Sequence, residues 1–163
     1  MAASSGTAKV TLPADDQILV TREFDAPRHL VFKAWTTPEL VARWWPANHG
    51  DPTVTEIDLR VGGRWRYVFV TPDGTEVGFH GEYREVVPDE RIVYTEMYEG
   101  APDDDATPTV NTLTLTEQDG RTTLQLLTEA PTTAVRDAIL ESGMESGLQA
   151  GLDILEQIAV SLR

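Results

Sequence analysis

The chain has 163 residues, carries 13 basic against 27 acidic residues for a formal net charge of −14, and contains no cysteine. This length suits one domain, which can bury about 68–70% of its unfolded surface without disulfides or metal staples. The missing cysteine excludes disulfides, thiolate metal sites and thiol nucleophiles, and the acidic surface argues against binding nucleic-acid phosphates.

The ends of the chain predict one domain with no membrane partner. Residues 1–16 are small and polar and predict a flexible tail, and residues 17–163 form the domain. Residues 1–13 lack the charged start and apolar run of a secretory signal, and no apolar run approaches a membrane span. We therefore expect a cytoplasmic protein.

A strand and two short helices come first. Residues 17–24 (QILVTREF) are rich in β-forming residues and predict a strand. Asp25 and Pro27 then predict a helix start, because aspartate can cap and proline is tolerated in the first turn. Thr37 and Pro38 repeat this signal, so a second short helix is expected to end near residue 46.

Short β-rich runs alternate with turn signals in the middle of the chain. The predicted strands cover residues 53–59, 64–71, 77–87, 91–98, 109–117 and 121–128. Most connections are short, as in antiparallel hairpins. The longest connection holds Asp103, Asp104 and Asp105, a run that we interpret as solvated carboxylates rather than as a cation site.

Two helices are predicted at the end of the chain. Residues 131–141 form a lead-in helix, and Ser142 with Glu145 predicts a capping box for a long helix over residues 142–163. Apolar residues recur along it in steps of three and four: Met144, Leu148, Leu152, Leu155, Ile158, Ala159 and Leu162.

Glycines recur every four residues in that helix, at Gly143, Gly147 and Gly151. Each interior glycine costs about 1 kcal/mol of helix propensity relative to alanine. A strip of glycines along this helix therefore requires a structural explanation. One interpretation is close packing on a sheet. The other is that the strip borders a cavity with room for a ligand.

This element order predicts an α+β fold, in which helices are segregated to one face of an antiparallel sheet. A sheet of about seven strands must twist. If it also curls, its concave face can wrap the long C-terminal helix.

Several blocks of residues resemble the START-like (SRPBCC) helix-grip superfamily, which includes the birch-pollen-allergen fold. The blocks, in the family's order, are residues 24–27 (FDAP), 31–35 (VFKAW), 37–45 (TPELVARWW), 58–65 (DLRVGGRW), 79–86 (FHGEYREV), 88–96 (PDERIVYTE) and 147–155 (GLQAGLDIL). They are most similar to the branch related to the activator of the heat-shock-protein-90 ATPase. The resemblance implies a cavity between the curved sheet and the C-terminal helix, which takes apolar or amphipathic small molecules.

Strand alternation and helix spacing select candidate residues for that cavity. Trp65, Tyr67 and Phe69 share one strand face and form either core or pocket wall. The full set of candidate ligand-binding residues is Trp35, Trp44, Trp65, Tyr67, Phe69, Phe79, Tyr83, Tyr94, Glu96, Met144, Leu148 and Leu152. The tyrosine hydroxyls and Glu96 are the best polar candidates; an ordinary solvent-facing carboxylate is the alternative for Glu96.

Trp44 and Trp45 are adjacent and point in different directions on a helix. One could seal the core while the other lies at the cavity mouth, or both could anchor the short helices. In the relatives, an aromatic residue is often found where this chain has Met144, so the pocket shape is not carried over from them.

Metal and cofactor sites are not expected. His29, His49 and His80 lie on different predicted elements, and no phosphate-binding glycine loop or nucleophile elbow occurs. The leading hypothesis is therefore a small-ligand binding protein without a cofactor, and any oligomer is expected to be a homodimer.

Two alternative functions stay open. A polyketide-type cyclase or dehydratase would use Glu96, Glu85, His80 or a tyrosine as acid or base. A chaperone-interacting module would follow the co-chaperone of the same branch. That co-chaperone carries an additional domain ahead of this one, so a chaperone partner is the least favoured.

Overall fold

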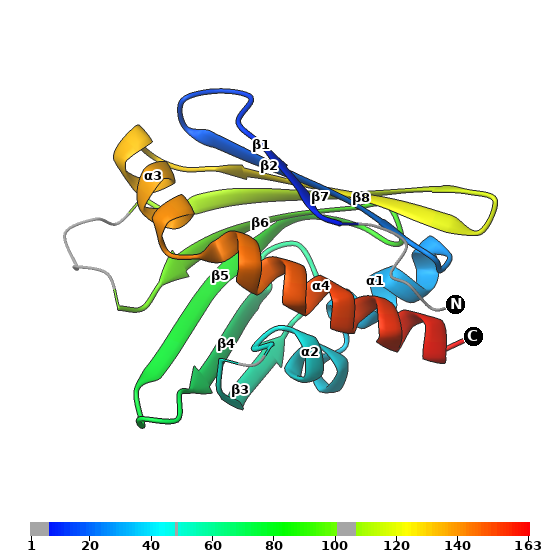
Figure 1. Ribbon diagram of the computed structural model, residues 1–163, viewed down its shortest axis with the longest axis horizontal. Coiled ribbons are helices and arrows are strands. Elements are labelled where there is room, and N and C mark those ends of the chain that lie inside the picture. Colours follow the sequence, from blue (N-terminus) through cyan, green and yellow to red (C-terminus); the bar gives the residue numbers. More distant parts are fainter. Residues whose placement is uncertain (1–6, 48, 101–106) are drawn as a thin grey trace.

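The computed structural model describes residues 7–47, 49–100 and 107–163, so the aspartate run at Asp103 to Asp105 lies outside the described residues. The strands are β1 Lys9–Thr11, β2 Gln17–Phe24, β3 Asp51–Ile57, β4 Arg64–Val70, β5 Glu76–Val87, β6 Arg91–Tyr98, β7 Thr109–Gln118 and β8 Arg121–Glu129 (Figure 1). The helices are α1 Arg28–Thr36, α2 Pro38–Trp44, α3 Thr133–Glu141 and α4 Met144–Ser161.

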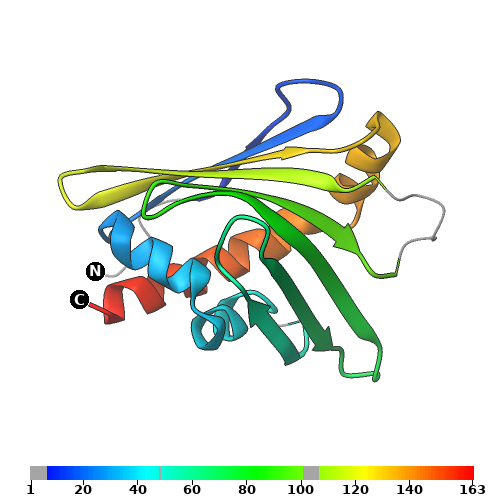
Figure 2. The same cartoon turned by 180° about the vertical axis from the view of Figure 1, so that it is seen from behind.

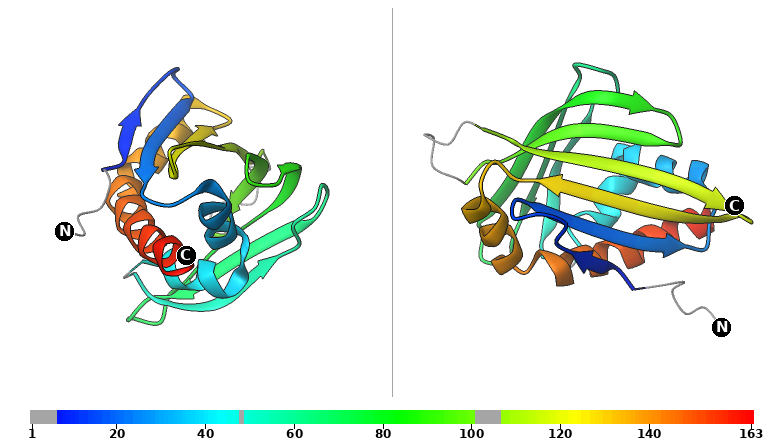
Figure 3. Two further views of the ribbon diagram at one scale, coloured as in Figure 1. Left: turned by 90° about the vertical axis from the view of Figure 1, so that its right-hand side faces the viewer. Right: turned by 90° about the horizontal axis from the view of Figure 1, so that it is seen from above.

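The strands form one eight-stranded sheet in the order β1-β2-β8-β7-β6-β5-β4-β3. Every neighbouring pair is antiparallel, and β3 to β8 follow one another as a meander. The sheet is strongly curved, and α4 runs across its concave side with α1 and α2 beside it (Figures 2 and 3). The predicted α+β helix-grip fold is therefore confirmed.

The core fills the concave side where β2, β7 and β8 face the helices. Alternate residues of these strands are buried, as the two-residue period of a strand requires: Ile18, Val20, Phe24, Leu113, Leu115, Leu124 and Leu126. They meet the apolar stripe of α4, in which Leu152, Leu155 and Ile158 are buried. Each such side chain stabilises the fold by about 1.5–3 kcal/mol on burial.

An eighth strand, β1, lies in the stretch where the sequence predicts a loose tail. Its three residues pair with β2, and Val10 faces Val20. The Ala8 N–H donates to Gln149 Oε1 of α4 at 2.7 Å. Three residues are too few to show a period, so only the partner strand reveals β1.

The predicted side-chain caps of three helices are wrong. Pro27 precedes α1 and Thr37 precedes α2, and neither helix has a side-chain cap. Gly143 precedes α4 with a φ of 84°, a left-handed conformation that leaves no capping box with Ser142. Ser142 instead ends α3, where its hydroxyl donates to the Ile139 carbonyl.

Pro38 does occupy the first turn of α2, as predicted. The ends of the seven predicted strands agree with the structure to within two residues. Within the described residues, no helix combines the length and apolar character needed to cross a membrane.

Candidate functional site

Aromatic side chains line the concave face of β4, β5 and β6. Trp65 lies next to Tyr67 on β4, with ring centroids 4.8 Å apart, and 5.7 Å from Tyr94 on β6. Tyr83 of β5 lies 6.4 Å from Tyr94. Such pairs add about 0.5–1.5 kcal/mol beyond the area that they bury. We call these four residues, together with Trp45, Phe69 and Phe79, the aromatic wall.

The adjacent tryptophans at the end of α2 point to different places. The Trp44 indole is buried, donates to the Ala34 carbonyl at 2.9 Å and packs 4.8 Å from Trp35. Trp45 is half-buried and makes edge contacts with Tyr67, Phe69 and Phe79 at 5.2, 5.4 and 5.6 Å. The sequence predicts Trp44 as a ligand-binding residue, but it is Trp45 that joins the aromatic wall. Trp35 and Trp44, both candidates from the sequence, pack in the core.

A close approach between the backbones of β5 and β6 positions Trp65. A Cβ added at Gly81 of β5 would lie 1.7 Å from the Thr95 carbonyl oxygen of β6, so only glycine fits there. The Trp65 indole N–H donates to this same carbonyl at 3.0 Å. The β5–β6 pairing also carries an irregularity between Tyr83 and Glu85. Glycine kinks and bulges of this kind bend a strand and increase its twist.

Three polar side chains form a chain of hydrogen bonds beside the aromatic wall, which we call the relay. Glu96 of β6 lies on the same strand face as Tyr94, and the Asn111 amide donates to Glu96 Oε1 at 2.7 Å. The Thr128 hydroxyl donates to Asn111 Oδ1, also at 2.7 Å. Asn111 is only 2% exposed. The relay crosses β6, β7 and β8 on the concave face, so Glu96 is not an ordinary solvent-facing carboxylate.

The sequence does not reveal Asn111 and Thr128 as part of the site. Each lies in a β-rich run with several other polar residues, most of which face away from the core, so nothing in the run marks it out. Their pairing across β7 and β8, directly opposite each other, appears only once the register is known.

Burial controls the ionisation of this region. Burial raises the pKa of Glu96, and the hydrogen bond from Asn111 opposes this shift. Burial also raises the pKa of Tyr67 and of Tyr94 well above the usual range, and the charge of Glu96 adds to both shifts. The pKa of Tyr83 is raised mainly by burial. The phenols therefore stay neutral at pH 7 and offer hydroxyl groups.

The glycine strip of α4 serves close packing at two of its three positions. A Cβ at Gly151 would lie 2.9 Å from the Trp44 carbonyl oxygen, and one at Gly147 would lie 3.2 Å from His49 Nε2. The close-packing interpretation therefore holds for both, although α2 and the following loop take the place of the expected sheet. Around Gly143, by contrast, a Cβ would meet open space.

The two halves of α4 differ in how they are covered. Leu152 is fully buried in the core, whereas Met144 and Leu148 near the start of the helix are half-buried. The preceding helix α3 contributes no buried residue. The predicted site residues on α4 thus divide between the core and a looser end.

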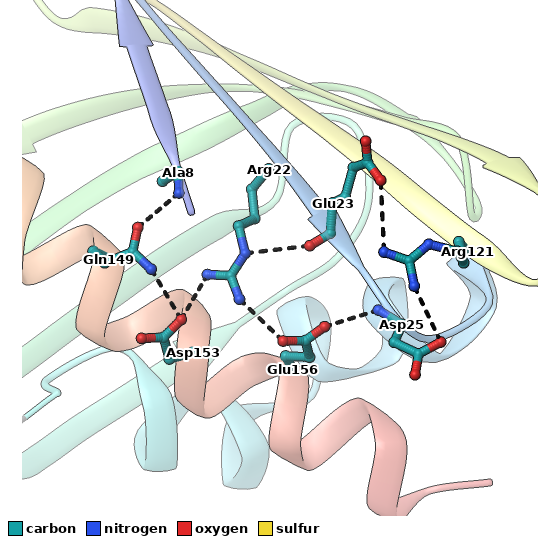
Figure 4. Close-up of polar contacts among 8 residues, drawn as sticks. All are labelled: Ala8, Arg22, Glu23, Asp25, Arg121, Gln149, Asp153 and Glu156. Carbon is teal, nitrogen blue, oxygen red and sulfur yellow. Dashed lines mark hydrogen bonds and ion pairs between the residues drawn. The ribbon is translucent and has the colours of Figure 1, made fainter. Parts of the chain in front are cut away.

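Buried ion pairs of Arg22 on β2 hold the second half of α4 against the sheet (Figure 4). The Arg22 side chain is 0% exposed; its Nη2 lies 3.0 Å from Glu156 Oε1 and its Nη1 2.9 Å from Asp153 Oδ1. Glu156 Oε2 also accepts the Asp25 backbone N–H at 2.8 Å. Asp25 thus meets α4 through its backbone instead of capping α1.

Two of the candidate catalytic residues lie away from Glu96. His80 is exposed on the opposite face of β5, where its Nδ1 lies 2.9 Å from Glu99 Oε2. Glu85 pairs with Arg91 at 2.6 Å, and both side chains are about half exposed. Among the described residues, no three His, Asp or Glu side chains are grouped to hold a metal ion.

A hollow of about 320 Å³ lies on the convex face of the sheet, over β2, β7 and β8. Its lining is Pro13, Gln17, Leu19, Thr112, Thr114, Gln125 and Leu127. These strand residues alternate with the core residues, so this hollow faces away from α4 and from the aromatic wall.

Comparison with known proteins identifies the family of this chain and several structures that are similar to it. A family model described as "Activator of Hsp90 ATPase homolog 1-like protein" matches residues 25–159. A search of curated proteins finds no match.

Solved structures from three bacteria share the fold. A protein from Rhodobacter sphaeroides is 24% identical with a TM-score of 0.86, and the match covers 96% of this chain and 99% of that one. Protein Ms6760 from Mycobacterium smegmatis is 22% identical with a TM-score of 0.83, covering 94% and 96%. Protein CV1439 from Chromobacterium violaceum is 29% identical with a TM-score of 0.77, covering 90% and 98%.

Proposed function

Because the chain belongs to the family of Activator of Hsp90 ATPase homolog 1-like proteins, within the START-like superfamily, we propose that it binds a small apolar or amphipathic molecule. The molecule would lie between the aromatic wall of the curved sheet and the first half of α4. Ligand pockets are mainly apolar with a few placed polar groups, and the wall with Glu96 has this composition.

One observation carries the proposal. Glu96 and Tyr94 lie deep enough for burial to raise the pKa of each side chain, yet both retain accessible surface. They sit on the concave face, which α4 covers. Accessible surface on two largely buried groups of a covered face supports a hollow beside the wall.

The looser end of α4 supports the same location. Met144 and Leu148 are half-buried, and no residue of α3 ahead of them is fully buried, although Ile139 and Leu140 pack half-buried against the core. The other half of α4 is held by Arg22 and by the apolar core. We place the entrance of the ligand between the first turns of α4 and the rim of the sheet.

The chaperone role belongs to the protein for which the family is named. The similar structures from Rhodobacter sphaeroides and Mycobacterium smegmatis share the fold alone. Fold alone does not transfer a function, so the chemistry of the concave face directs the proposal.

Filling the proposed hollow tests this function. We expect the neutral fluorescent probe N-phenyl-1-naphthylamine to bind the purified chain, and Leu148→Trp to weaken binding about tenfold or more, a loss of about 1.4 kcal/mol. Val160→Trp is the matched control, because Val160 lies on the same helix and is 41% exposed. Native mass spectrometry of the wild-type chain would report any molecule that copurifies.

The proposal fails if the probe does not bind and no copurifying mass is found. It also fails if the variants at positions 148 and 160 weaken binding equally, since the probe would then lie outside the hollow. Circular dichroism of each variant establishes that the fold is intact.

A further inference from the structure

The environment of Glu96 points to the chemistry of the ligand. The relay fixes one of its oxygens: Thr128 donates to Asn111, and Asn111 in turn donates to Glu96 Oε1. That oxygen must therefore accept a hydrogen bond, a role that suits the ionised carboxylate. Within the described residues, no hydrogen bond to the other oxygen, Oε2, is formed.

Glu96 has no partner of opposite charge in the part of the chain that the structure describes. Among residues 7–47, 49–100 and 107–163, no ion pair joins it to a basic side chain, and its one polar partner is the Asn111 amide. A buried charge without a counter-charge is costly and is normally paired. A cationic group on the ligand would remove this cost.

Aromatic rings surround the same position. Glu96 lies two residues from Tyr94 on the same face of β6, and Trp65 connects the Tyr94 ring to Tyr67 on that face. Trp65 contacts both of their rings, at 4.8 and 5.7 Å between centroids. Tryptophan and tyrosine faces attract alkylammonium groups within about 6 Å, by about 0.5–2 kcal/mol for each contact.

The net charge of the whole chain also favours a cationic ligand. With a formal net charge of −14, the protein attracts cations and repels anions such as fatty-acid carboxylates. An anionic ligand would also place its charge beside Glu96. A neutral ligand would leave the carboxylate uncompensated.

We infer that the ligand carries one positively charged nitrogen on an apolar body, and that Glu96 holds this charge beside Trp65, Tyr67 and Tyr94. This inference rests on the proposed function, because the binding space is the same. It adds the charge class of the ligand and gives Glu96 the role of a specificity-determining residue.

Three probes of matched length test the inference: 4-phenylbutyltrimethylammonium, 4-phenylbutan-1-ol and 4-phenylbutyrate, each titrated into the full chain by calorimetry at neutral pH. We expect the cation to bind about tenfold or more tightly than the alcohol, and the carboxylate to bind most weakly. Glu96→Gln should abolish the preference for the cation while the alcohol still binds.

Glu82→Gln is the control, because it removes the same charge from the exposed face of β5. We expect it to leave the order of the three probes unchanged. If it abolishes the preference as well, net charge rather than Glu96 selects the ligand, and the inference is overturned.

Two further results separate the inference from the proposed function. Equal affinity of the wild-type chain for the cation and the alcohol overturns the cationic ligand while leaving a small-molecule site in place. No binding of any of the three probes, together with no binding of N-phenyl-1-naphthylamine, overturns both.

Discussion

Arg22 of β2 and Glu156 of α4 are 134 positions apart in the chain, and their side chains meet at 3.0 Å inside the protein. The Arg22 side chain is 0% exposed and the Glu156 side chain 7% exposed. Asp153 reaches the same guanidinium one helical turn earlier. This cluster holds one end of the long helix against the sheet.

Removing the guanidinium should be costly. Arg22→Met leaves the Glu156 carboxylate buried without the positive charge of the guanidinium, and we expect a loss of about 3–5 kcal/mol in the free energy of unfolding. Urea denaturation measures this loss. Arg121→Met is the matched control, because Arg121 meets Glu23 and Asp25 at 3.6 and 3.5 Å in exposed positions and should cost about 0–1 kcal/mol.

The double variant Arg22→Met with Glu156→Gln tests whether the pair itself is the cause. It should recover part of the loss, because no full charge then stays buried at position 156. A double variant as unstable as the sum of the two single variants would contradict the buried-charge explanation.

Glu96 should make stability fall as pH rises. Burial raises its pKa in the folded state above the ordinary value of 4.5, so the folded protein holds its proton more tightly than the unfolded chain. The contribution is fully present below pH 4.5 and is lost as pH rises through the folded pKa. Glu96→Gln should remove this decline, giving a stability advantage over the wild type that grows toward neutral pH.

Urea unfolding at a series of pH values measures the Glu96 effect, with Glu82→Gln as the control on the opposite face. An advantage for Glu96→Gln that stays constant with pH, or that shrinks toward neutral pH, would contradict the burial of this carboxyl group.

Glu99 should have the opposite effect on the pH dependence of stability, because its contribution is lost as the pH falls. Its hydrogen bonds from Arg66, and secondarily from His80, lower its pKa from 4.5 to about 2. Its contribution to stability is therefore present above pH 4.5 and is lost as pH falls toward about 2. The stability difference between the wild type and Glu99→Gln should vanish over this window.

Salt distinguishes this surface cluster from the interior site. Because the Arg66 and His80 side chains are 43% and 51% exposed, high salt should weaken the Glu99 effect. It should change the Glu96 effect much less. Equal sensitivity to salt at both positions would contradict their different burial.

Two glycines of α4 should respond to alanine with opposite signs. At Gly151 the new Cβ would lie 2.9 Å from the Trp44 backbone oxygen, so we expect Gly151→Ala to cost about 1–3 kcal/mol. At Gly147 the neighbour, at 3.2 Å, is the exposed His49 ring, which can move aside. Gly147→Ala should stabilise the chain by up to about 1 kcal/mol through helix propensity.

Thermal unfolding of the two variants, with wild type as reference, measures both changes. A stabilising Gly151→Ala would mean that α2 and α4 pack less closely there than the structure shows.

Local patterns in the sequence predict most of the elements and the strand residues of the aromatic wall. The alternation of Trp65, Tyr67 and Phe69 placed them on one face, and the observed β4 keeps that face concave. The period of α4 predicts its apolar stripe, and Leu155 of that stripe lies in the core, as does Leu152, a ligand-binding candidate from the sequence. These features depend on residues close in sequence, where the backbone geometry fixes the direction of each side chain.

Features that depend on distant partners were not predicted. Arg22 occupies a core-facing position of an alternating strand, and this was a signal, but its partners on α4 become visible only in three dimensions. Asn111 and Thr128 required the register of β7 and β8. Choosing between Trp44 and Trp45 required the angle at which α2 meets the sheet, which neither residue encodes locally.

The carbonyl of Thr95 both receives the Trp65 indole and rules out a side chain at Gly81. The close approach of β5 to β6 and the position of the Trp65 ring therefore depend on the same oxygen atom. A homologue with a bulkier residue at this position would have to separate these strands and move its indole together, so the shape of the sheet and the outline of the aromatic wall would change in evolution as one inherited trait.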